Sequence, residues 1–252
     1  VAEAQELAAL ANEKGLQLAV FQNRRWDSDF KTVQKILQDK ILGDIVEAEI
    51  HFDRYNPYLS PKVHKETQNA GAGILKDLGP HIIDQALCLF GFPDAVNGDI
   101  RITRAHSLVD DWIDITLFYP DLRVRLKAGF FVREPHPSYT FHGKKGSFLK
   151  ARGDVQEDEL KLGKKPNTTD WGTEPEHLKG LLHTESNGTI IKEFVPTEQG
   201  NYYAFFEGVY QAILHGKKVP VSAAESVQVM QIIEAAIASH QQQQRIKVSS
   251  FD

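Results

Sequence analysis

The stretch that decides the fold is residues 45–53, Ile-Val-Glu-Ala-Glu-Ile-His-Phe-Asp, in which apolar and polar side chains alternate. Successive side chains of a β-strand point to opposite faces, so this pattern predicts a strand with one buried face and one wet face. We expect the core-facing set to be Val46, Ala48, Ile50 and Phe52. A sheet with one wet face is typical of antiparallel architectures.

The same signal recurs outward from this strand. Residues 124–132 alternate in the same way, and further strands are predicted near 96–104, 112–119, 139–149, 189–194 and 245–248. Helical spacing of apolar residues predicts helices over 27–40, 78–90, 201–214 and 222–240, the last opened by a Ser-Ala-Ala-Glu capping box. Residues 150–188 are polar and predict long connections with at most one short strand. The order of elements predicts an α+β domain.

The first residues show a different pattern. Residues 2–14 predict a helix that ends at Gly15, and residues 16–21 predict a short buried strand. This helix–strand pair is typical of the last part of an α/β unit. Because the chain begins Val-Ala-Glu-Ala without a methionine, we interpret it as a fragment of a longer protein.

Composition excludes several classes of protein. Of the 252 residues, 41% are hydrophobic and 25% are charged, which is ordinary for a globular protein. The net charge of −5 is spread along the chain, with no basic stripe for nucleic acid and no polybasic amphipathic segment for a membrane surface. The single cysteine, Cys88, lies in an apolar helical pattern and is predicted to be a buried, inert thiol. These features fit a cytoplasmic protein.

The segment from Gly71 to Asp84 carries the strongest sign of chemistry. Asp77 and His81 are four residues apart, so on a helix they share a face. A carboxylate beside an imidazole suits a general acid or base, but Asp77 as a helix N-cap and His81 as a half-buried structural histidine is an equally simple interpretation. A third interpretation adds Asp84 to form a metal site, although no second cluster of ligands supports it.

Two further segments place polar side chains where a predicted strand ends. Arg24 and Arg25 follow Phe21, and they either meet a ligand or lie on the surface. Arg54 and Tyr55 follow the alternating strand. Their directed hydrogen bonds would suit a polyhydroxylated substrate, while the alternative is an ordinary exposed turn.

The combination of segments is more specific than any one of them. In chain order they read FQNRRWDSDF (21–30), DRYNP (53–57), GILKDLGPHIIDQALCLFG (73–91), HGKKGSF (142–148) and PVSAAESVQVMQIIEAA (220–236). Together they resemble the Gfo/Idh/MocA oxidoreductases, the glucose–fructose oxidoreductase and inositol dehydrogenase family. The branch they most resemble contains the NADP-dependent scyllo-inositol dehydrogenases.

The resemblance implies two parts. Residues 1–22 would be the tail of an NAD(P)-binding Rossmann domain. Residues 23–252 would be the substrate and oligomerisation domain, built on a large, mostly antiparallel open sheet with helices on one face. The family's Gly-rich dinucleotide fingerprint and its Glu-Lys-Pro motif are missing. We therefore expect the covered polypeptide to be inactive alone, and the parent protein to use NAD or NADP.

The resemblance also implies roles for single residues. In the family motif, His81 would take the proton of the substrate hydroxyl, while Asp77 would bind substrate and tune that histidine. Arg24 and Arg25 would lie near the nicotinamide. Arg54 and Tyr55 would lie on the substrate side, where a sugar or cyclic polyol binds. No residue is assigned to a metal.

Two alternatives remain open at this point. The sheet could act as a non-catalytic dimerisation or ligand-binding module, although such a protein would usually have lost Asp77 or His81. A carbon–oxygen lyase or an aldose reductase of the same family is not separated by these residues. We expect a homodimer or homotetramer that pairs through the open sheet, with apolar faces of 46–52 and 124–132 in the contact.

Overall fold

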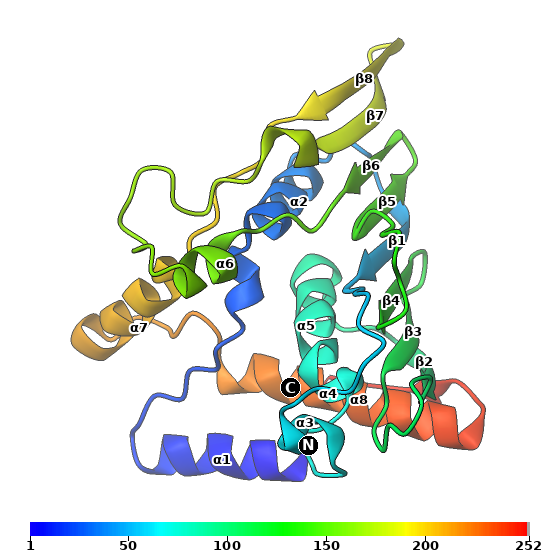
Figure 1. Cartoon of the computed structure of the whole chain (residues 1–252). Helices are drawn as coiled ribbons and strands as arrows, with labels where there is room; N and C mark the ends of the chain where they lie inside the picture. Colours follow the sequence, from blue (N-terminus) through cyan, green and yellow to red (C-terminus); the bar gives the residue numbers. More distant parts are fainter. Residues whose placement is uncertain (251–252) are drawn as a thin grey trace.

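A single large sheet organises the molecule. The computed structural model describes residues 1–250, and within them nine strands hydrogen-bond in the order β8-β7-β6-β5-β1-β4-β3-β2-β9 (Figure 1). The central pair β1·β4 is parallel and all other pairs are antiparallel. The strands are β1 (Ile45–His51), β2 (Ala95–Arg101), β3 (Trp112–Phe118), β4 (Arg123–Gly129), β5 (Tyr139–Gly143), β6 (Gly146–Lys150), β7 (Gly180–Ser186), β8 (Thr189–Val195) and β9 (Ile246–Lys247). The predicted mostly antiparallel sheet is confirmed.

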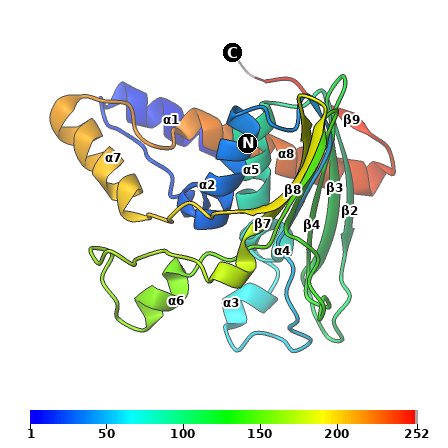
Figure 2. The same ribbon diagram turned by 90° about the horizontal axis from the view of Figure 1, so that it is seen from above.

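The helices gather on one side of this sheet, as Figure 2 shows from above. They are α1 (Ala2–Glu13), α2 (Ser28–Gln38), α3 (Val63–Glu66), α4 (Ile74–Asp77), α5 (Gly79–Phe90), α6 (Gln156–Lys161), α7 (Tyr203–His215) and α8 (Ala223–Gln242), with 3-10 turns η1 (Asn23–Trp26) and η2 (Glu176–Leu178). The capping box that begins α8 forms as predicted between Ser222 and Glu225. Within residues 1–250, no helix combines the length and apolarity needed to cross a bilayer.

The core lies between the central strands and the helices α5, α8 and α2. Alternate residues of β3 and β4 are fully buried, among them Ile113, Ile115, Val124 and Leu126. They meet Ile82 of α5 and the apolar side of α8 in one contiguous cluster. Burying such side chains contributes about 1.5–3 kcal/mol each, so the sheet and the helices stabilise one another.

The alternation that predicted β1 is broken at its start. The pairing of β1 with β5 shifts register between Ile45 and Glu47, and Val46 is 41% exposed instead of facing the core. A β-bulge adds one residue and so turns the side chain at that point to the other face. The expected position of Val46 is therefore wrong, whereas Ala48, Ile50 and Phe52 are buried as predicted.

The face of the sheet that carries no helix is charged. Arg125 of β4 pairs with Asp114 of β3 at 2.6 Å and lies beside Glu49 of β1 in the strand register. The apolar faces of 46–52 and 124–132 are covered by helices, so our expectation that they supply an exposed apolar contact is wrong. A sheet whose strands alternate in this way buries only one face, because each strand turns its charged residues to the other face.

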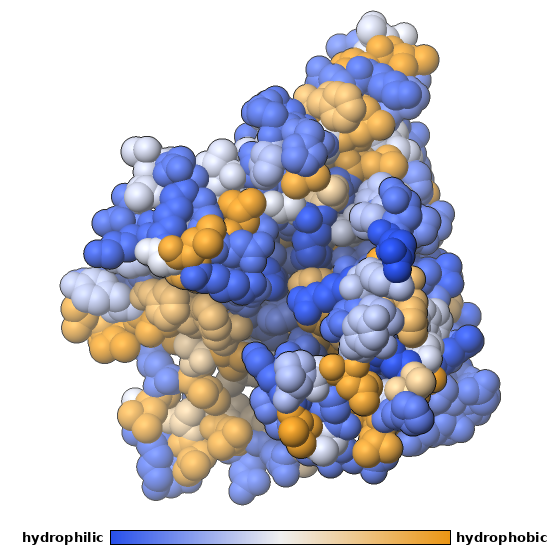
Figure 3. All heavy atoms as spheres, viewed as in Figure 1, coloured by the Kyte–Doolittle hydropathy of each residue, from blue (hydrophilic) through white to orange (hydrophobic). Residues whose placement is uncertain are grey.

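The segment after α1 is not the buried strand that the sequence predicted. Only Ala19 forms a β-bridge, to Ser222, and Leu16, Leu18 and Phe21 are exposed. Among residues 1–250, no neighbouring strand lies alongside this segment to extend the pairing. Figure 3 shows apolar side chains gathered over α1 and α7, and a hollow between these helices and the sheet. The helix α1 itself is confirmed, with Gly15 in the left-handed conformation at its end.

Candidate functional site

The Gly71–Asp84 segment folds into two short helices at one end of the sheet. Gly73 has φ +92°, and a Cβ there would lie 2.1 Å from the Asp110 carboxylate, so only glycine fits. This close approach lets Asp110 accept the backbone N–H of Leu75 at 2.7 Å, in the first turn of α4. The chain then breaks at Leu78 and restarts as α5 with Pro80 in the first turn.

The break separates the two residues of the sequence motif. Asp77 ends α4 and His81 begins α5, and the helix N-cap is Leu78, so the interpretation of Asp77 as N-cap is wrong. The contacts found among residues 1–250 include no hydrogen bond between Asp77 and His81. Instead, Lys65 of α3 donates to both carboxylate oxygens of Asp77, at 2.8 and 3.1 Å. Asp77 therefore acts on His81 through its charge.

A buried arginine fixes the segment that carries Lys65. The Arg104 side chain is 2% exposed and pairs with both Glu66 and Asp111 at 3.0 Å. It also donates to the carbonyl oxygen of Tyr58, and its guanidinium lies over the ring of Phe130. Arg104 thus contacts two carboxylates, one carbonyl oxygen and one aromatic ring. These contacts hold α3 beside α4.

His81 is held as a neutral imidazole. Its Nδ1 is buried and has no hydrogen-bond partner. Burial, together with the neighbouring charges of Arg24 and Arg152, lowers the pKa of His81 to about 4, against the opposing effects of Asp77 and Glu157. At neutral pH the imidazole can therefore accept a proton, and Nε2 is the ring nitrogen free to do so.

Three arginines surround one aromatic ring beside this histidine. The guanidinium carbons of Arg152, Arg54 and Arg24 lie 4.3, 5.2 and 5.4 Å from the centre of the Phe52 ring. Arg24 is tied to Glu157 at 2.6 Å, whereas the exposed Arg54 forms no ion pair or side-chain hydrogen bond found in residues 1–250. No sequence pattern pointed to Arg152, because it lies in a polar connection without periodicity.

Arg25 occupies a different environment from Arg24. Its guanidinium donates to both oxygens of Asp84, at 2.8 and 2.7 Å, and to Glu225 at 2.7 Å. These contacts join η1 to α5 and α8. The bidentate pair also engages the Asp84 carboxylate that a metal site would need. Among residues 1–250, no three His, Cys, Asp or Glu side chains are grouped so that they could hold a metal ion.

Cys88 differs from its prediction. It is exposed, whereas Asp84, one turn earlier on the same side of the helix, is buried. Its thiol lies 4.0 Å from Asp84. Local desolvation and the Asp84 charge raise the pKa of the thiol to about 12, so it stays protonated despite its exposure.

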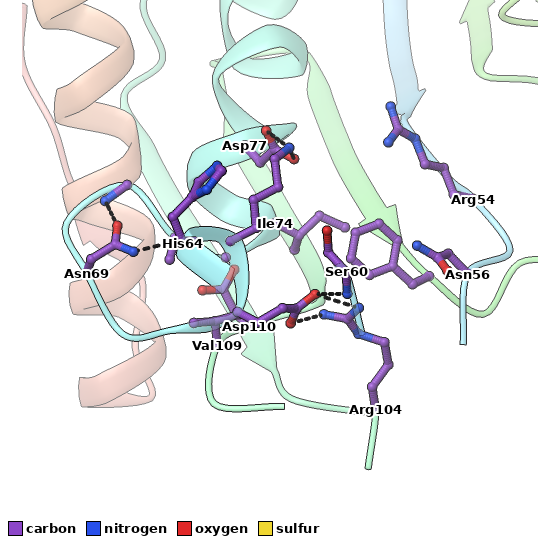
Figure 4. A pocket seen from close by; sticks show the side chains of 16 residues that line it. Arg54, Asn56, Ser60, His64, Asn69, Ile74, Asp77, Arg104, Val109 and Asp110 are labelled. Carbon is purple, nitrogen blue, oxygen red and sulfur yellow. Dashed lines mark hydrogen bonds and ion pairs between the residues drawn. The ribbon is translucent and has the colours of Figure 1, made fainter. Parts of the chain in front are cut away.

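A cavity of about 510 Å³ has Arg54, Lys65, Asp77 and Asp110 in its walls. His81, Arg24 and Arg152 are not among the residues that line it. Figure 4 shows Arg54, at the end of β1, across the cavity from Asp77. That volume suits a sugar-sized ligand. The structure therefore brings Arg54 and Asp77 to one cavity. Tyr55 lies apart from it, 45% exposed with the Arg133 guanidinium 3.9 Å from its ring centre.

Sequence reasoning missed Lys65, Arg104 and Arg152. Each comes from a polar segment without periodicity, and each acts through a contact distant in the chain. The best sequence signal for this part of the site was Gly73, the N-cap of α4. A glycine there predicts that another group packs closely against the backbone, but it does not tell which group.

Comparison with known proteins places this arrangement among oxidoreductases. A family model described as "Oxidoreductase family, C-terminal alpha/beta domain" matches residues 34–248. The chain is 36% identical to scyllo-inositol 2-dehydrogenase (NADP(+)) IolW of Bacillus subtilis (strain 168), over 97% of this chain and 68% of that protein. It is also 36% identical to the uncharacterized oxidoreductase YdgJ of Escherichia coli (strain K12), over 95% of this chain and 68% of that protein.

Solved structures agree with this match. The yvaA protein of Bacillus subtilis superposes with a TM-score of 0.94 at 36% identity, covering 98% of this chain and 70% of that one. An oxidoreductase from Bacillus cereus superposes with a TM-score of 0.89 at 32% identity, covering 99% of this chain and 83% of that one. The chain thus spans about two thirds or more of the length of these relatives.

Proposed function

This chain belongs to the Gfo/Idh/MocA family of oxidoreductases, and from that premise we propose that it carries the substrate side of an NAD(P)-dependent dehydrogenase. The reaction would oxidise a secondary hydroxyl of a sugar or a cyclic polyol. Residues 23–252 would form the substrate domain, and residues 1–22 the tail of a dinucleotide-binding domain. The name of the relative IolW supports the polyol class and NADP as the cofactor.

The neutral state of His81 is the observation that carries this proposal. A general base must be unprotonated at working pH, and the low pKa of His81 keeps it so. Nε2 would accept the hydroxyl proton while hydride leaves the same carbon, which becomes a carbonyl. The Asp77 charge would stabilise the imidazolium that forms, because it favours the protonated ring.

The residues present fit one end of the cofactor. The nicotinamide supplies the hydride acceptor. Arg24 borders His81 and has a buried Nε without a hydrogen-bond partner, so it could hold an acceptor group there. Arg25 has three of its N–H groups engaged by Asp84 and Glu225, so in that state we assign it to holding η1 in place.

The test is turnover by the protein together with its dinucleotide-binding domain. NADPH or NADH formation is followed with scyllo-inositol, myo-inositol and aldoses. His81→Ala should lower kcat by roughly 10²–10⁴-fold with nearly unchanged cofactor affinity. His183→Ala, which alters an exposed histidine of β7, is the control and should keep full activity.

Two outcomes would contradict the proposal. Undiminished turnover by His81→Ala would remove His81 as the base. Absence of turnover by the unaltered protein with every substrate and both cofactors would favour the non-catalytic module instead. The proposed homodimer or homotetramer would be checked by light scattering, and on this structure its sheet contact would be polar, because the uncovered face is charged.

A further inference from the structure

The surroundings of His81 contain an unusual concentration of unpaired polar atoms. Among residues 1–250, five buried side-chain nitrogen or oxygen atoms lack a hydrogen-bond partner. Three of them belong to Arg24, Arg152 and His81, which are electrostatic neighbours. Buried donors without partners are rare in folded proteins, so a cluster of them marks a place where a ligand supplies acceptors.

The charges around the Phe52 ring do not cancel. Three guanidinium groups face it, while the carboxylates paired with them are Glu157, on Arg24, and Asp27, which lies 3.5 Å from Arg24 and 3.8 Å from Arg152. Desolvation raises the pKa of Asp27 well above its usual range, which weakens its ability to neutralise either arginine. Arg54 has no carboxylate partner among residues 1–250, so its positive charge adds to this excess.

The cavity places that excess charge where a ligand can reach it. Arg54 lines the wall and is exposed, whereas Lys65 and Arg104 on the same wall are paired with carboxylates. The remaining wall carboxylate, Asp110, accepts a backbone N–H of α4 and sits at the Gly73 side of the cavity. An anionic group entering the cavity would therefore meet Arg54 first.

We propose that the substrate of this site is a polyol that carries an oxyanion, a carboxylate or a phosphate, held by Arg54, with Arg24 and Arg152 facing the same Phe52 ring. The inference rests on the proposed function, because it names the substrate class of that same site. The planar guanidinium of Arg54, whose central carbon lies 5.2 Å from the centre of the Phe52 ring, can offer two parallel N–H groups to an oxyanion. The polyol part then extends across the cavity toward Asp77, which lines the same walls.

Matched ligands test this without catalysis. D-Gluconate and D-sorbitol share one carbon chain and differ by a carboxylate, and D-sorbitol 6-phosphate adds a phosphate instead. Isothermal titration of the protein should show gluconate or sorbitol 6-phosphate binding at least about tenfold more tightly than sorbitol. The advantage should shrink as salt is added, because partly exposed charges are screened. Whichever of gluconate and sorbitol 6-phosphate binds more tightly shows whether the site prefers a carboxylate or a phosphate.

Variants complete the test. Arg54→Gln should abolish the advantage of the anionic ligand, so that this variant binds gluconate, sorbitol 6-phosphate and sorbitol with similar affinity. Arg245→Gln is the matched control, an exposed arginine stacked at 3.6 Å on Phe118. It should bind both ligands like the unaltered protein.

Three results would overturn the proposal. They are equal binding of sorbitol and both anionic polyols, an advantage that survives Arg54→Gln, and binding of acetate or inorganic phosphate as tight as that of the anionic polyols. Turnover of neutral polyols with no preference for an oxyanion would contradict this inference and leave the proposed function intact. If the protein binds anionic polyols more tightly but never turns them over, the inference stands and the proposed function fails.

Discussion

Removing the His81 imidazole should change how the stability of this protein depends on pH. The unfolded chain returns histidine to a pKa of about 6.5, whereas the folded value is about 4. Below pH 6.5 the unfolded state therefore binds more protons at this residue than the folded state. The stabilising contribution is complete above pH 6.5 and is lost as the pH falls toward 4.

The size of the effect follows from these two pKa values. Between pH 7 and pH 4.5 the linkage gives a loss of about 2 kcal/mol in the free energy of unfolding. His81→Gln should lack this loss. Buried carboxyls such as Asp27, Asp154 and Glu174 have raised pKa values and contribute with the opposite sign, but they are common to both proteins and cancel in the difference.

The assay is urea unfolding of both proteins at pH 7 and pH 4.5, with an NMR titration of the His81 ring as a direct check. The unaltered protein should lose about 2 kcal/mol more than His81→Gln over this interval. Equal losses in the two proteins, or a His81 resonance that titrates near pH 6.5, would refute the reasoning. The site would then be wetter or less positive than the structure shows.

Two further predictions concern the frame of the site. Arg104→Met leaves Glu66 and Asp111 without their cation, and should cost about 3–5 kcal/mol of stability in urea unfolding; a loss under about 1 kcal/mol would show that this arginine does not anchor α3. Gly98→Ala would place a Cβ 2.6 Å from the Ala236 carbonyl oxygen and should cost about 1–3 kcal/mol, whereas Gly71→Ala, whose Cβ would meet only the Asn69 Oδ1 at 3.8 Å, should be nearly neutral. Equal stability of the two glycine variants would contradict the close packing of β2 against α8.

Periodicity and capping chemistry predicted most of the fold. The helix over 222–240 and its capping box are confirmed, and the alternation at 124–132 corresponds to β4. These signals are local: a helix needs one apolar stripe and a cap, and a strand needs alternate burial. The family resemblance is confirmed as well, because the motifs that carried it are spread along the whole chain.

The sequence predictions failed at positions whose structure depends on a neighbouring strand or helix. Residues 16–21 have strand-like composition but only one bridging partner, at Ala19. Val46 is apolar, yet a bulge against β5 turns it outward. Cys88 lies in an apolar run, yet it is exposed in the folded chain. Strand pairing and helix orientation are properties of two elements at once, so one segment cannot specify them.

For the candidate site, the sequence by itself determined the chemical groups. These are the carboxylate of Asp77, the imidazole of His81 four residues later, and Gly73, a position that only glycine fits. The tertiary structure decided their environment. In the folded chain Asp77 pairs with Lys65 and makes no hydrogen bond to His81. Arg24 and Arg152 lie close enough to the imidazole to lower its pKa. The physical reason is that a pKa depends on burial and on every nearby charge, and those charges come from segments far apart in the chain.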